Sequence, residues 1–372
     1  MTAHLFSPIR LGGVDLANRL VVAPMCQYSA DDGSANAWHM MHLGALANSG
    51  AGLLIVEATA VERIGRITHG CLGIYSDANE AALGPVLEAC RKFGSAKLGI
   101  QLGHAGRKAS SRRPWEGKSL QDPIDSSEAW QQVAPSAHSF WPNGPIPRAL
   151  AVDDMKVLRD TFVHAAERSV RLGFDVIEVH AAHGYLLHQF LSPLSNTRTD
   201  SYGSSREGRM CLPLEIFEAM RAVIPSTIAF GIRVSAVDWI DGGLTIDDTV
   251  AFAQELKRRG CDFIDVSTGG SDPALRPPVG PGYQVPFAER LKRETGLPTM
   301  AVGLITAPQQ AEAILAEGKA DMIAIARAFL DDPHWGWHAA YALGAEVALP
   351  PQYRRAGIKQ WQPAEAHKVR RV

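Results

Sequence analysis

Short apolar runs alternate with longer amphipathic segments along almost the whole chain. The apolar runs are rich in Val, Ile and Leu and lie at residues 20–23, 53–56, 97–101, 175–179, 228–234, 263–267, 299–302 and 322–326. Nearly continuous runs of this length are typical of parallel strands that are buried on both faces. Segments with helical periodicity lie between them. The pattern therefore predicts about eight strand–helix units, the number that closes a barrel.

Start and stop signals support the predicted helices. Asp77 to Glu80 and Thr306 to Gln309 have the pattern of a capping box, and Thr245 to Asp248 is a looser version. Glycines follow the helical segments at positions 94, 173, 260, 296 and 318. We expect an α/β protein with a (β/α)8 TIM barrel. The alternative is an open doubly wound sheet, but no Gly-x-Gly-x-x-Gly follows the first strand.

Two segments lie outside the repeat. Residues 9–16 flank Gly12-Gly13 and predict an N-terminal β-hairpin that caps the barrel floor. Residues 105–152 form a long insertion after the third strand, with Trp115, Trp130 and Trp141. Such a loop is usually an active-site lid or disordered, and the tryptophans favour a lid. We expect a single barrel domain at residues 1–345 and a C-terminal extension at 346–372.

The composition excludes several classes of protein. The 372 residues include 37 Lys+Arg and 39 Asp+Glu, a formal net charge of -2, and 46% are hydrophobic. These values argue against a disordered chain and against binding to a phosphate backbone, so no nucleic-acid partner is expected. The 5 cysteines are scattered and form no Cys-x-x-Cys pair. This argues against a disulfide framework, a structural zinc site and an iron–sulfur cluster.

The sequence shows no targeting signal and no membrane segment. The first residues lack the basic region followed by an apolar one that a secretory signal requires. The most apolar stretch, residues 44–61, is interrupted by Asn48 and Glu57 and is too polar to span a bilayer. We therefore expect a reduced, cytoplasmic protein without a membrane partner.

Polar side chains follow the apolar strands at many consecutive units. They are Gln27 and Tyr28, Glu57, Gln101 with His104 and Lys108, His180 with His183 and Tyr185, Arg233, Ser267 and Arg327. Residues at the carboxyl ends of barrel strands face the active site. Packing alone does not explain so regular an arrangement, so the chain is expected to be an enzyme.

The ends of the seventh and eighth strands predict an anion site. The seventh strand ends at Gly303, ahead of an expected helix, and the eighth runs into Arg327. Glycine lets an anion approach the backbone, a helix N-terminus favours negative charge, and Arg can bind through two nitrogens. Barrels commonly hold a phosphate at this place. The alternative is a tight turn with a surface salt bridge.

His180 and His183 admit three interpretations. They can be ordinary satisfied histidines, which is less natural for two at one strand end beside Tyr185. They can ligate a metal, with Glu57 and Glu178 as loose candidates for further ligands, although the spacing is not His-Glu-x-x-His. They can also be two donors to a carbonyl or nitro oxygen, with Tyr185 as the proton source. The residues alone leave the last two interpretations nearly level.

The same positions carry a resemblance to the old yellow enzymes. It rests on Pro24-Met25-Cys26-Gln27-Tyr28, Val56-Glu-Ala58-Thr-Ala-Val61, Gln101-Leu-Gly-His-Ala-Gly-Arg-Lys108, His180-Ala-Ala-His183-Gly-Tyr185-Leu-Leu-His-Gln-Phe-Leu-Ser-Pro193 and Asn196-Thr-Arg-Thr-Asp-Ser-Tyr-Gly203. The chain is most similar to the short, thermophilic-like branch that includes the xenobiotic reductases. The resemblance implies an FMN-bound barrel. Such an enzyme passes a hydride from NADPH or NADH to an activated carbon–carbon double bond.

The resemblance assigns one set of residues to the flavin. They are the backbone at Pro24, Met25, Cys26 and Ala58, Gln101 at the pyrimidine edge, Arg233 by N1 and O2, and Gly303, Ala326 and Arg327 at the phosphate. Cys26 would also tune the redox potential; without the family it would be a small buried side chain. The family usually has Gly-Arg where this chain has Ala326-Arg327, so a methyl group lies next to the expected phosphate.

A second set would serve the substrate, an enone, enal, maleimide or nitro compound. Tyr28 would contact it, His180 and His183 would bind its carbonyl, and Tyr185 would protonate its α-carbon. Arg355 lies in a segment that, in this branch, reaches into the partner's active site. It is the candidate for a cross-subunit arginine in a homodimer or a dimer of dimers, and the alternative is a free basic tail.

Two other activities compete with this prediction. A metal-dependent hydrolase on the same barrel would use His180, His183 and His104 and would contain metal. An FMN-dependent tRNA dihydrouridine synthase would need a basic surface and an RNA-binding domain, and the sequence shows neither. The favoured prediction is an FMN-dependent NADPH dehydrogenase, or ene-reductase, without a metal.

Overall fold

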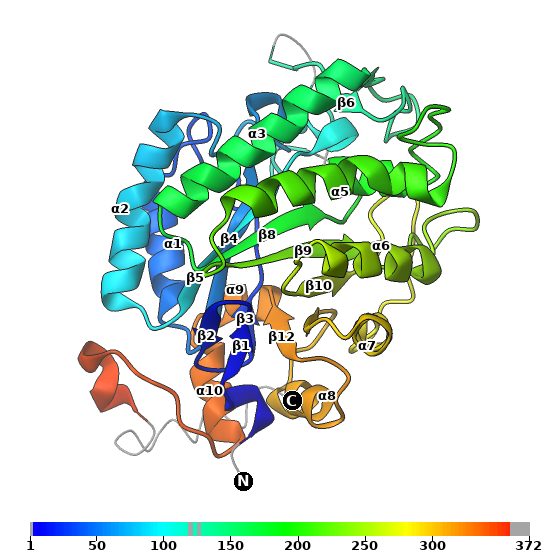
Figure 1. Ribbon diagram of the computed structural model, residues 1–372. Coiled ribbons are helices and arrows are strands. Elements are labelled where there is room, and N and C mark those ends of the chain that lie inside the picture. Colours follow the sequence, from blue (N-terminus) through cyan, green and yellow to red (C-terminus); the bar gives the residue numbers. More distant parts are fainter. Residues whose placement is uncertain (1–2, 118–121, 125–127, 358–372) are drawn as a thin grey trace.

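The computed structural model describes residues 3–117, 122–124 and 128–357, in which eight parallel strands close into a barrel (Figure 1). The strands are β3 (Leu20–Val22), β4 (Leu53–Ala60), β5 (Lys97–Gly103), β8 (Val176–Ala181), β9 (Ala229–Ser235), β10 (Ile264–Ser267), β11 (Thr299–Ala301) and β12 (Met322–Ile325). Each strand pairs with the next in chain order, and β12 pairs with β3 to complete the circle. The predicted TIM barrel is confirmed.

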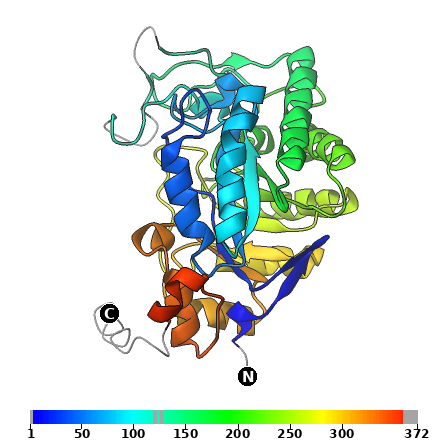
Figure 2. The same ribbon diagram turned by 90° about the vertical axis from the view of Figure 1, so that its left-hand side faces the viewer.

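Helices cover the outside of the barrel. The longer ones are α1 (Ala37–Ala47), α2 (Asp77–Phe93), α3 (Val152–Arg171), α5 (Arg206–Val223), α6 (Ile246–Arg258), α7 (Val285–Thr295), α8 (Pro308–Ala316) and α10 (Trp335–Ala342). Short α4 (Leu186–Leu191) and α9 (Arg327–Asp331) and 3-10 turns at His4–Phe6, Arg63–Gly65, Gly106–Lys108 and Pro351–Ala356 complete the set. Helices α3 and α5 lie side by side in Figure 1, as do α1 and α2 in Figure 2.

One of the predicted helix starts is confirmed and two are wrong. Thr245 caps α6, and its hydroxyl accepts a hydrogen bond from the Asp248 backbone at 3.2 Å. Helix α2 is capped by Ser76, one residue before the predicted Asp77, because the Ser76 hydroxyl accepts from the Asn79 N–H. Helix α8 begins at Pro308, two residues after the predicted Thr306. Proline suits this first position, where its missing N–H costs nothing.

The N-terminal hairpin closes the amino end of the barrel, as predicted. Strands β1 (Ile9–Leu11) and β2 (Val14–Leu16) pair antiparallel around Gly12-Gly13. Their apolar side chains pack in one cluster with the residues that fill the barrel floor, among them Val21, Leu53, Val176, Ala229, Phe263, Met300 and Met322. A Cβ added at Gly13 would lie 2.3 Å from the Ser226 carbonyl oxygen. Glycine at this turn therefore lets the hairpin sit flush against the barrel.

The insertion follows β5, and its β6 lies toward the top of the molecule in Figure 1, near one end of α3. Within the described part of the insertion, β6 (Val133–Ala134) pairs with β7 (Arg148–Ala149). The Trp130 indole donates a hydrogen bond to the Ile64 carbonyl at 2.8 Å, while the Trp115 side chain is 64% exposed. Trp130 thus ties the insertion to the loop after β4. Residues 118–121 and 125–127 of the expected lid lie outside the described part of the chain, as do residues 358–372 of the expected extension.

In the ranges that the structure describes, no helix has both the length and the apolar character needed to cross a bilayer.

Packing in the barrel floor predicts a large stability effect at Phe263. Its ring is fully buried, so Phe263→Ala is expected to lower the free energy of unfolding by about 3–5 kcal/mol in urea titrations. The matched control is Phe93→Ala, because Phe93 is 56% exposed. Its cost should stay below about 0.5 kcal/mol. Similar losses in the two variants would contradict the closed floor.

Candidate active site

The barrel interior is arranged in layers because side chains on a strand alternate between its two faces. Val176, Ala229 and Phe263 belong to the apolar floor. Two residues further along the same strands stand Glu178, Gly231 and Asp265, and two further again stand His180, Arg233 and Ser267. The predicted residues His180 and Arg233 are direct neighbours in the pairing of β8 with β9. The carboxyl ends of the strands thus form a polar mouth above an apolar floor.

A buried acidic layer lies beneath this mouth. The Gln101 amide donates to Glu178 Oε1 at 2.7 Å, and Arg233 Nε lies 3.1 Å from Asp265 Oδ2. Glu178 and Asp265 are both fully buried. Burial and the nearby Asp265 raise the pKa of Glu178 to about 8, against the opposing effects of Arg233 and Gln101. Burial also raises the pKa of Asp265, although Arg233 opposes the shift. The sequence indicates Glu178 only as a loose candidate for a metal ligand, although its two-residue spacing from His180 places both side chains on one face of β8.

His180 and His183 form a pair of neutral imidazoles. Burial, followed by the positive charge of Arg233, lowers the pKa of both rings well below the usual range. The Ala182 N–H donates to His180 Nδ1, so the remaining His180 proton is on Nε2, which lies 3.4 Å from His183 Nδ1. His183 Nε2 lies 2.7 Å from the Ser267 hydroxyl. The Ser267 hydroxyl donates to Gln284, so it accepts the N–H of His183 Nε2, and His180 Nε2 faces His183. Each neutral ring thus has one N–H, and an oxygen that binds there would replace Ser267 or the neighbouring ring as its acceptor.

The metal interpretation of this pair finds no ligand set. Among residues 3–117, 122–124 and 128–357, no three His, Cys, Asp or Glu side chains are grouped to hold a metal ion. Glu57 lies at a β-bulge of β4, where the register with β5 shifts between Val56 and Ala58. Its carboxylate instead accepts a hydrogen bond from the Gln27 N–H at 2.9 Å and faces His39. Buried His104 contacts Glu62 at 3.2 Å. His104 and Glu57 are therefore engaged in other contacts.

Tyr185 stands edge-on to His180, with ring centroids 5.0 Å apart. The Lys108 ammonium lies 5.0 Å from the centre of the Tyr185 ring and donates to the carbonyls of His183 and Gly270 at 2.7 and 3.0 Å. Burial and then Arg107 lower the pKa of Lys108 to about 7. Lys108 thus positions the loop that carries His183, which has a left-handed φ of 58°. The sequence places Lys108 at a strand end but gives it no role.

A second buried network ties the loops after β8 and β9 to one carboxylate. Asp238 follows β9 and accepts hydrogen bonds from Ser192 at 2.6 Å and from the Leu244 N–H at 2.8 Å. It also lies 3.2 Å from His188 Nε2. His188 Nδ1 in turn accepts the Gly184 N–H at 2.8 Å, between His183 and Tyr185. Although burial opposes ionisation, His188 and the hydroxyl donors hold the pKa of Asp238 well below its usual range.

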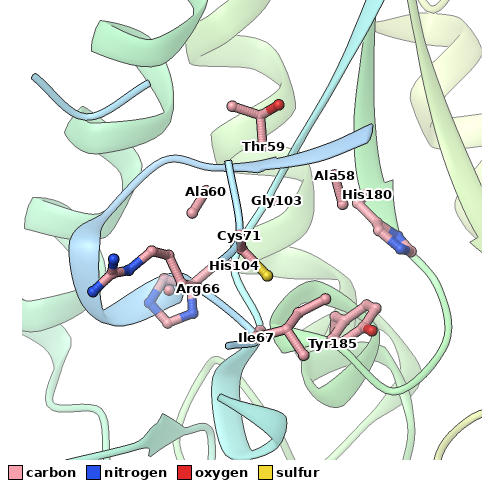
Figure 3. Close-up of a pocket in the computed structure, with 12 residues that line it drawn as sticks. Ala58, Thr59, Ala60, Arg66, Ile67, Cys71, Gly103, His104, His180 and Tyr185 are labelled. Atoms are coloured by element: carbon pink, nitrogen blue, oxygen red, sulfur yellow. The ribbon is translucent and has the colours of Figure 1, made fainter. Parts of the chain in front are cut away.

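Residues from the loops after β3 and β4 also pack near Tyr185. Cys26 and Tyr28 pack with Ile67, Cys71 and Tyr185 in one small cluster. Figure 3 shows the pocket lined by Ala58, His104, His180 and Tyr185, where Tyr185 lies next to Ile67 and the Cys71 thiol points toward them. Burial, helped by the nearby Cys71 and Glu57, raises the pKa of the Cys26 thiol well above its usual range. Cys26 is therefore a neutral thiol.

The residues predicted to hold an anion line one cavity of about 180 Å³. It brings Gly303, Ala326 and Arg327 together with Arg233 and Ser267. Gly303 has a φ of 109°, and an added Cβ would lie 2.9 Å from the Gln284 amide nitrogen. The helix expected after Gly303 begins at Pro308, so residues 304–307 separate the glycine from the helix N-terminus. The predicted anion site thus has loop backbone on one side and two guanidinium groups.

These features fit a flavin nucleotide. The cavity joins the Arg327 end, where a phosphate is expected, to Arg233 at the barrel axis. Glycine at position 303 lets a ligand approach the backbone closely. Pro24, Met25 and Ala58 follow β3 or lie in β4, at the same end of the barrel.

Arg355 is exposed and lies apart from this cluster within its own chain. It belongs to the 3-10 turn η4 (Pro351–Ala356). Tyr353 in that turn packs against His334 and Trp337, beside α10, with centroids 6.1 and 5.9 Å apart. Arg355 is therefore exposed beside α10.

Comparisons with known proteins identify relatives over almost the whole chain. Residues 4–346 match the model of the NADH:flavin oxidoreductase / NADH oxidase family. A Geobacillus thermodenitrificans protein named NADPH dehydrogenase is 43% identical over 95% of this chain and 99% of its own length. A Listeria innocua protein of the same name is 44% identical with the same coverage. The solved structure of morphinone reductase is 29% identical with a TM-score of 0.75, covering 95% of this chain and 93% of its own. The old yellow enzyme homologue from Zymomonas mobilis is 26% identical, with a TM-score of 0.74 over 93% and 94%.

The Asp238 network predicts a pH-dependent loss of stability in Asp238→Asn. An amide would present an NH2 group to the donors of Ser192 and Leu244, so unfolding is expected to become easier by about 1–3 kcal/mol at pH 7. The folded-state pKa of Asp238 is lowered, so its stabilisation is present above the unfolded-state pKa, about 3.9, and is lost at lower pH. The difference in stability between the two proteins should shrink below about pH 4.

The control is Asp241→Asn, a change at an exposed carboxylate in the same loop, which should behave as wild type. A pH-independent difference would argue against an ionised Asp238.

Proposed function

Because the chain belongs to the NADH:flavin oxidoreductase / NADH oxidase family, we propose that it is an FMN-dependent NADPH dehydrogenase that reduces activated carbon–carbon double bonds. The resemblance to the old yellow enzymes that the sequence predicts is confirmed by the family match and by the solved relatives. The relatives named NADPH dehydrogenase support the choice of electron donor, and a morphinone reductase structure with tetrahydroNAD supports a nicotinamide ligand. The proposed substrates are α,β-unsaturated carbonyl and nitro compounds: enones, enals, maleimides and nitroalkenes.

One observation carries the proposal. His180 is the direct neighbour of Arg233 across β8 and β9, and Arg233 lines the cavity that ends at Arg327. A pair of neutral N–H donors therefore stands beside the place where a flavin fits. Reduction of an enone needs such donors next to the hydride source, because negative charge develops on the carbonyl oxygen.

The proposed FMN site divides between backbone and side chains. The isoalloxazine would be lined by the backbone at Pro24, Met25, Cys26 and Ala58. Gln101 and Arg233 would contact its pyrimidine edge. The phosphate would be held by Gly303, Ala326 and Arg327. The chemistry that FMN supplies when bound is the transfer of a hydride between the nicotinamide and the substrate. Cys26, kept neutral by burial, is a thiol suited to tuning that chemistry without adding charge.

His180 and His183 would bind the substrate's carbonyl or nitro oxygen. A neutral imidazole has one N–H and one acceptor nitrogen, and the hydrogen bonds to Ala182 and Ser267 orient the two rings. Removing one donor of this kind typically costs about 10²–10³ in rate. Tyr28, which packs in the same cluster as Tyr185, would contact the substrate from the β3 side.

Tyr185 would give a proton to the α-carbon. Its ring stands edge-on to His180, so the phenol is close to the group that binds the neighbouring oxygen. The Lys108 ammonium near the Tyr185 ring favours the phenolate that remains after the proton leaves. Lys108 would therefore assist the proton transfer through Tyr185.

The proposed assembly is a homodimer or a dimer of dimers. Arg355, exposed on η4 beside α10, is available to a neighbouring chain. In the proposal it enters the partner's active site and contacts the substrate there. An exposed basic turn at the end of the described chain fits this use.

The proposal is tested first by the visible absorption spectrum of the purified protein. Flavin bands are expected to bleach when NADPH is added without oxygen and to return when cyclohexenone follows. That sequence would identify the cofactor, the donor and the reaction class together. A colourless protein that cannot be reconstituted with FMN would overturn the proposal and favour a metal-dependent hydrolase. Flavin that is reoxidised by tRNA uridine rather than by enones would favour a dihydrouridine synthase.

The role of Tyr185 is tested by Tyr185→Phe in stopped-flow absorption. The reoxidation of the enzyme by cyclohexenone should slow by roughly 10²–10⁴, because only this half-reaction needs the proton. Reduction by NADPH should keep its rate. The matched control is Tyr202→Phe, whose hydroxyl contacts Glu215 on the outer helix α5 and should affect neither half. Equal slowing of both halves in Tyr185→Phe would remove Tyr185 from the acid role.

A further inference from the structure

We propose that at alkaline pH Glu178 binds a proton when the enzyme's flavin is reduced and releases it when the flavin is reoxidised. The inference rests on the proposed function, because it requires FMN in the cavity beside Arg233. It assigns a redox-linked protonation site to the buried layer beneath the barrel mouth. Glu178 would then be a positioning residue that acts through Arg233 and Gln101.

The first argument is the balance of charge in the layer. Two fully buried carboxylates, Glu178 and Asp265, share one guanidinium, that of Arg233, which is 8% exposed. Among the described residues, Glu178 Oε2 and both carboxylate oxygens of Asp265 have no hydrogen-bond partner, and Arg233 contacts Asp265 as an ion pair at 3.1 Å. With both acids ionised the layer would carry a net negative charge in a dry interior, which is costly. One bound proton makes the layer neutral.

Among the residues that the structure describes, Arg233 is the one cation that compensates the charge of Glu178. From β5 it faces Gln101, which is uncharged, from β9 it faces Arg233, and from β10 it faces Asp265. Along β8 itself, His180 lies above in the neutral form and Val176 lies below in the apolar floor. In the described part of the chain, Arg233 is thus the cation on which the ionisation of Glu178 depends.

The contacts favour Glu178 over Asp265 as the proton's site. Asp265 lies 3.1 Å from Arg233 Nε, whereas Glu178 receives a hydrogen bond only from a neutral amide. A carboxylate in contact with a cation stays ionised more readily than one without it. In agreement, the pKa of Glu178 is raised to about 8, so that a modest change of charge nearby decides its protonation at moderately alkaline pH.

Reduction of the cofactor supplies that change of charge. Arg233 also lines the cavity that would hold FMN. A hydride from the nicotinamide brings two electrons and one proton, so a neutral flavin ring becomes an anion. That anion attracts Arg233 and weakens the compensation of the two carboxylates. The proton affinity of Glu178 should therefore rise. A proton from water then forms the Glu178 O–H bond, and this bond breaks again when the hydride leaves for the substrate.

The test counts protons through the pH dependence of the flavin's midpoint potential. For a two-electron couple, each coupled proton contributes about 30 mV per pH unit. In the holoenzyme the slope should steepen from about 30 to about 60 mV per unit as pH rises through about 8, while the reduced flavin keeps its anionic absorption spectrum. Below about pH 8 Glu178 is protonated in both states and adds nothing to the slope.

Two variants isolate Glu178. Glu178→Gln should hold a slope of about 30 mV per pH unit throughout, because the amide does not titrate. The matched control is Glu57→Gln, the same change at a buried glutamate whose carboxylate accepts the Gln27 N–H. This control should keep the steeper slope. Steepening that persists in Glu178→Gln would overturn the proposal.

The wild-type protein alone also decides the question if Glu178→Gln does not fold. A slope of about 30 mV per pH unit from pH 7 to 10, with an anionic reduced flavin, would overturn the inference without the variant. In that case bleaching by NADPH and recovery with cyclohexenone would still support the proposed function. A protein that takes up no FMN would overturn both proposals.

Discussion

The alternation of side chains on eight closed strands is the constraint on which the rest of the structure depends. Successive side chains of a strand point to opposite faces. Each strand of a closed barrel therefore places every second residue in the interior. On β8, β9 and β10 this gives an apolar floor, then Glu178 and Asp265, and then His180, Arg233 and Ser267. The proposed donor His180 therefore stands directly above the buried Glu178. The chemistry of the mouth cannot be separated from the charge state of the layer below it.

Buried charge in turn determines how the loops at the mouth are held. The positive φ of 58° at His183 is a conformation that needs external support in a non-glycine residue, whereas the neighbouring Gly184 adopts its φ of 71° freely. Lys108 binds the His183 carbonyl, and His188 binds the Gly184 N–H. His188 in turn contacts Asp238. The ionised Asp238 and the Lys108 ammonium therefore fix the segment that carries the two catalytic candidates, His183 and Tyr185. Removing water from this region strengthens these contacts and also keeps the imidazoles neutral.

The sequence predicts the barrel well because strand periodicity, helix stops and strand count all agree. Each of the eight apolar runs overlaps an observed strand, and the hairpin and the insertion lie where expected. The predicted start of a helix is wrong where it depends on one hydrogen bond, as at Ser76 before α2, or on the path of a loop, as between Gly303 and α8. The sequence does not indicate that Glu178 and Asp265 form one acidic layer, because they lie on separate strands. Only the barrel's closure shows that Glu178 and Asp265 share one guanidinium.

Departures from the family pattern follow the same backbone logic. The family's usual glycine is replaced by Ala326, whose φ of -108° lies outside the left-handed region that favours glycine. Gly303, across the same cavity, has a φ of 109° that alanine would adopt only under strain. A site held largely by backbone N–H groups tolerates a change of side chain where the backbone keeps its path. The proposed phosphate site thus depends on the conformation at residue 303 more than on the absence of a methyl group at residue 326.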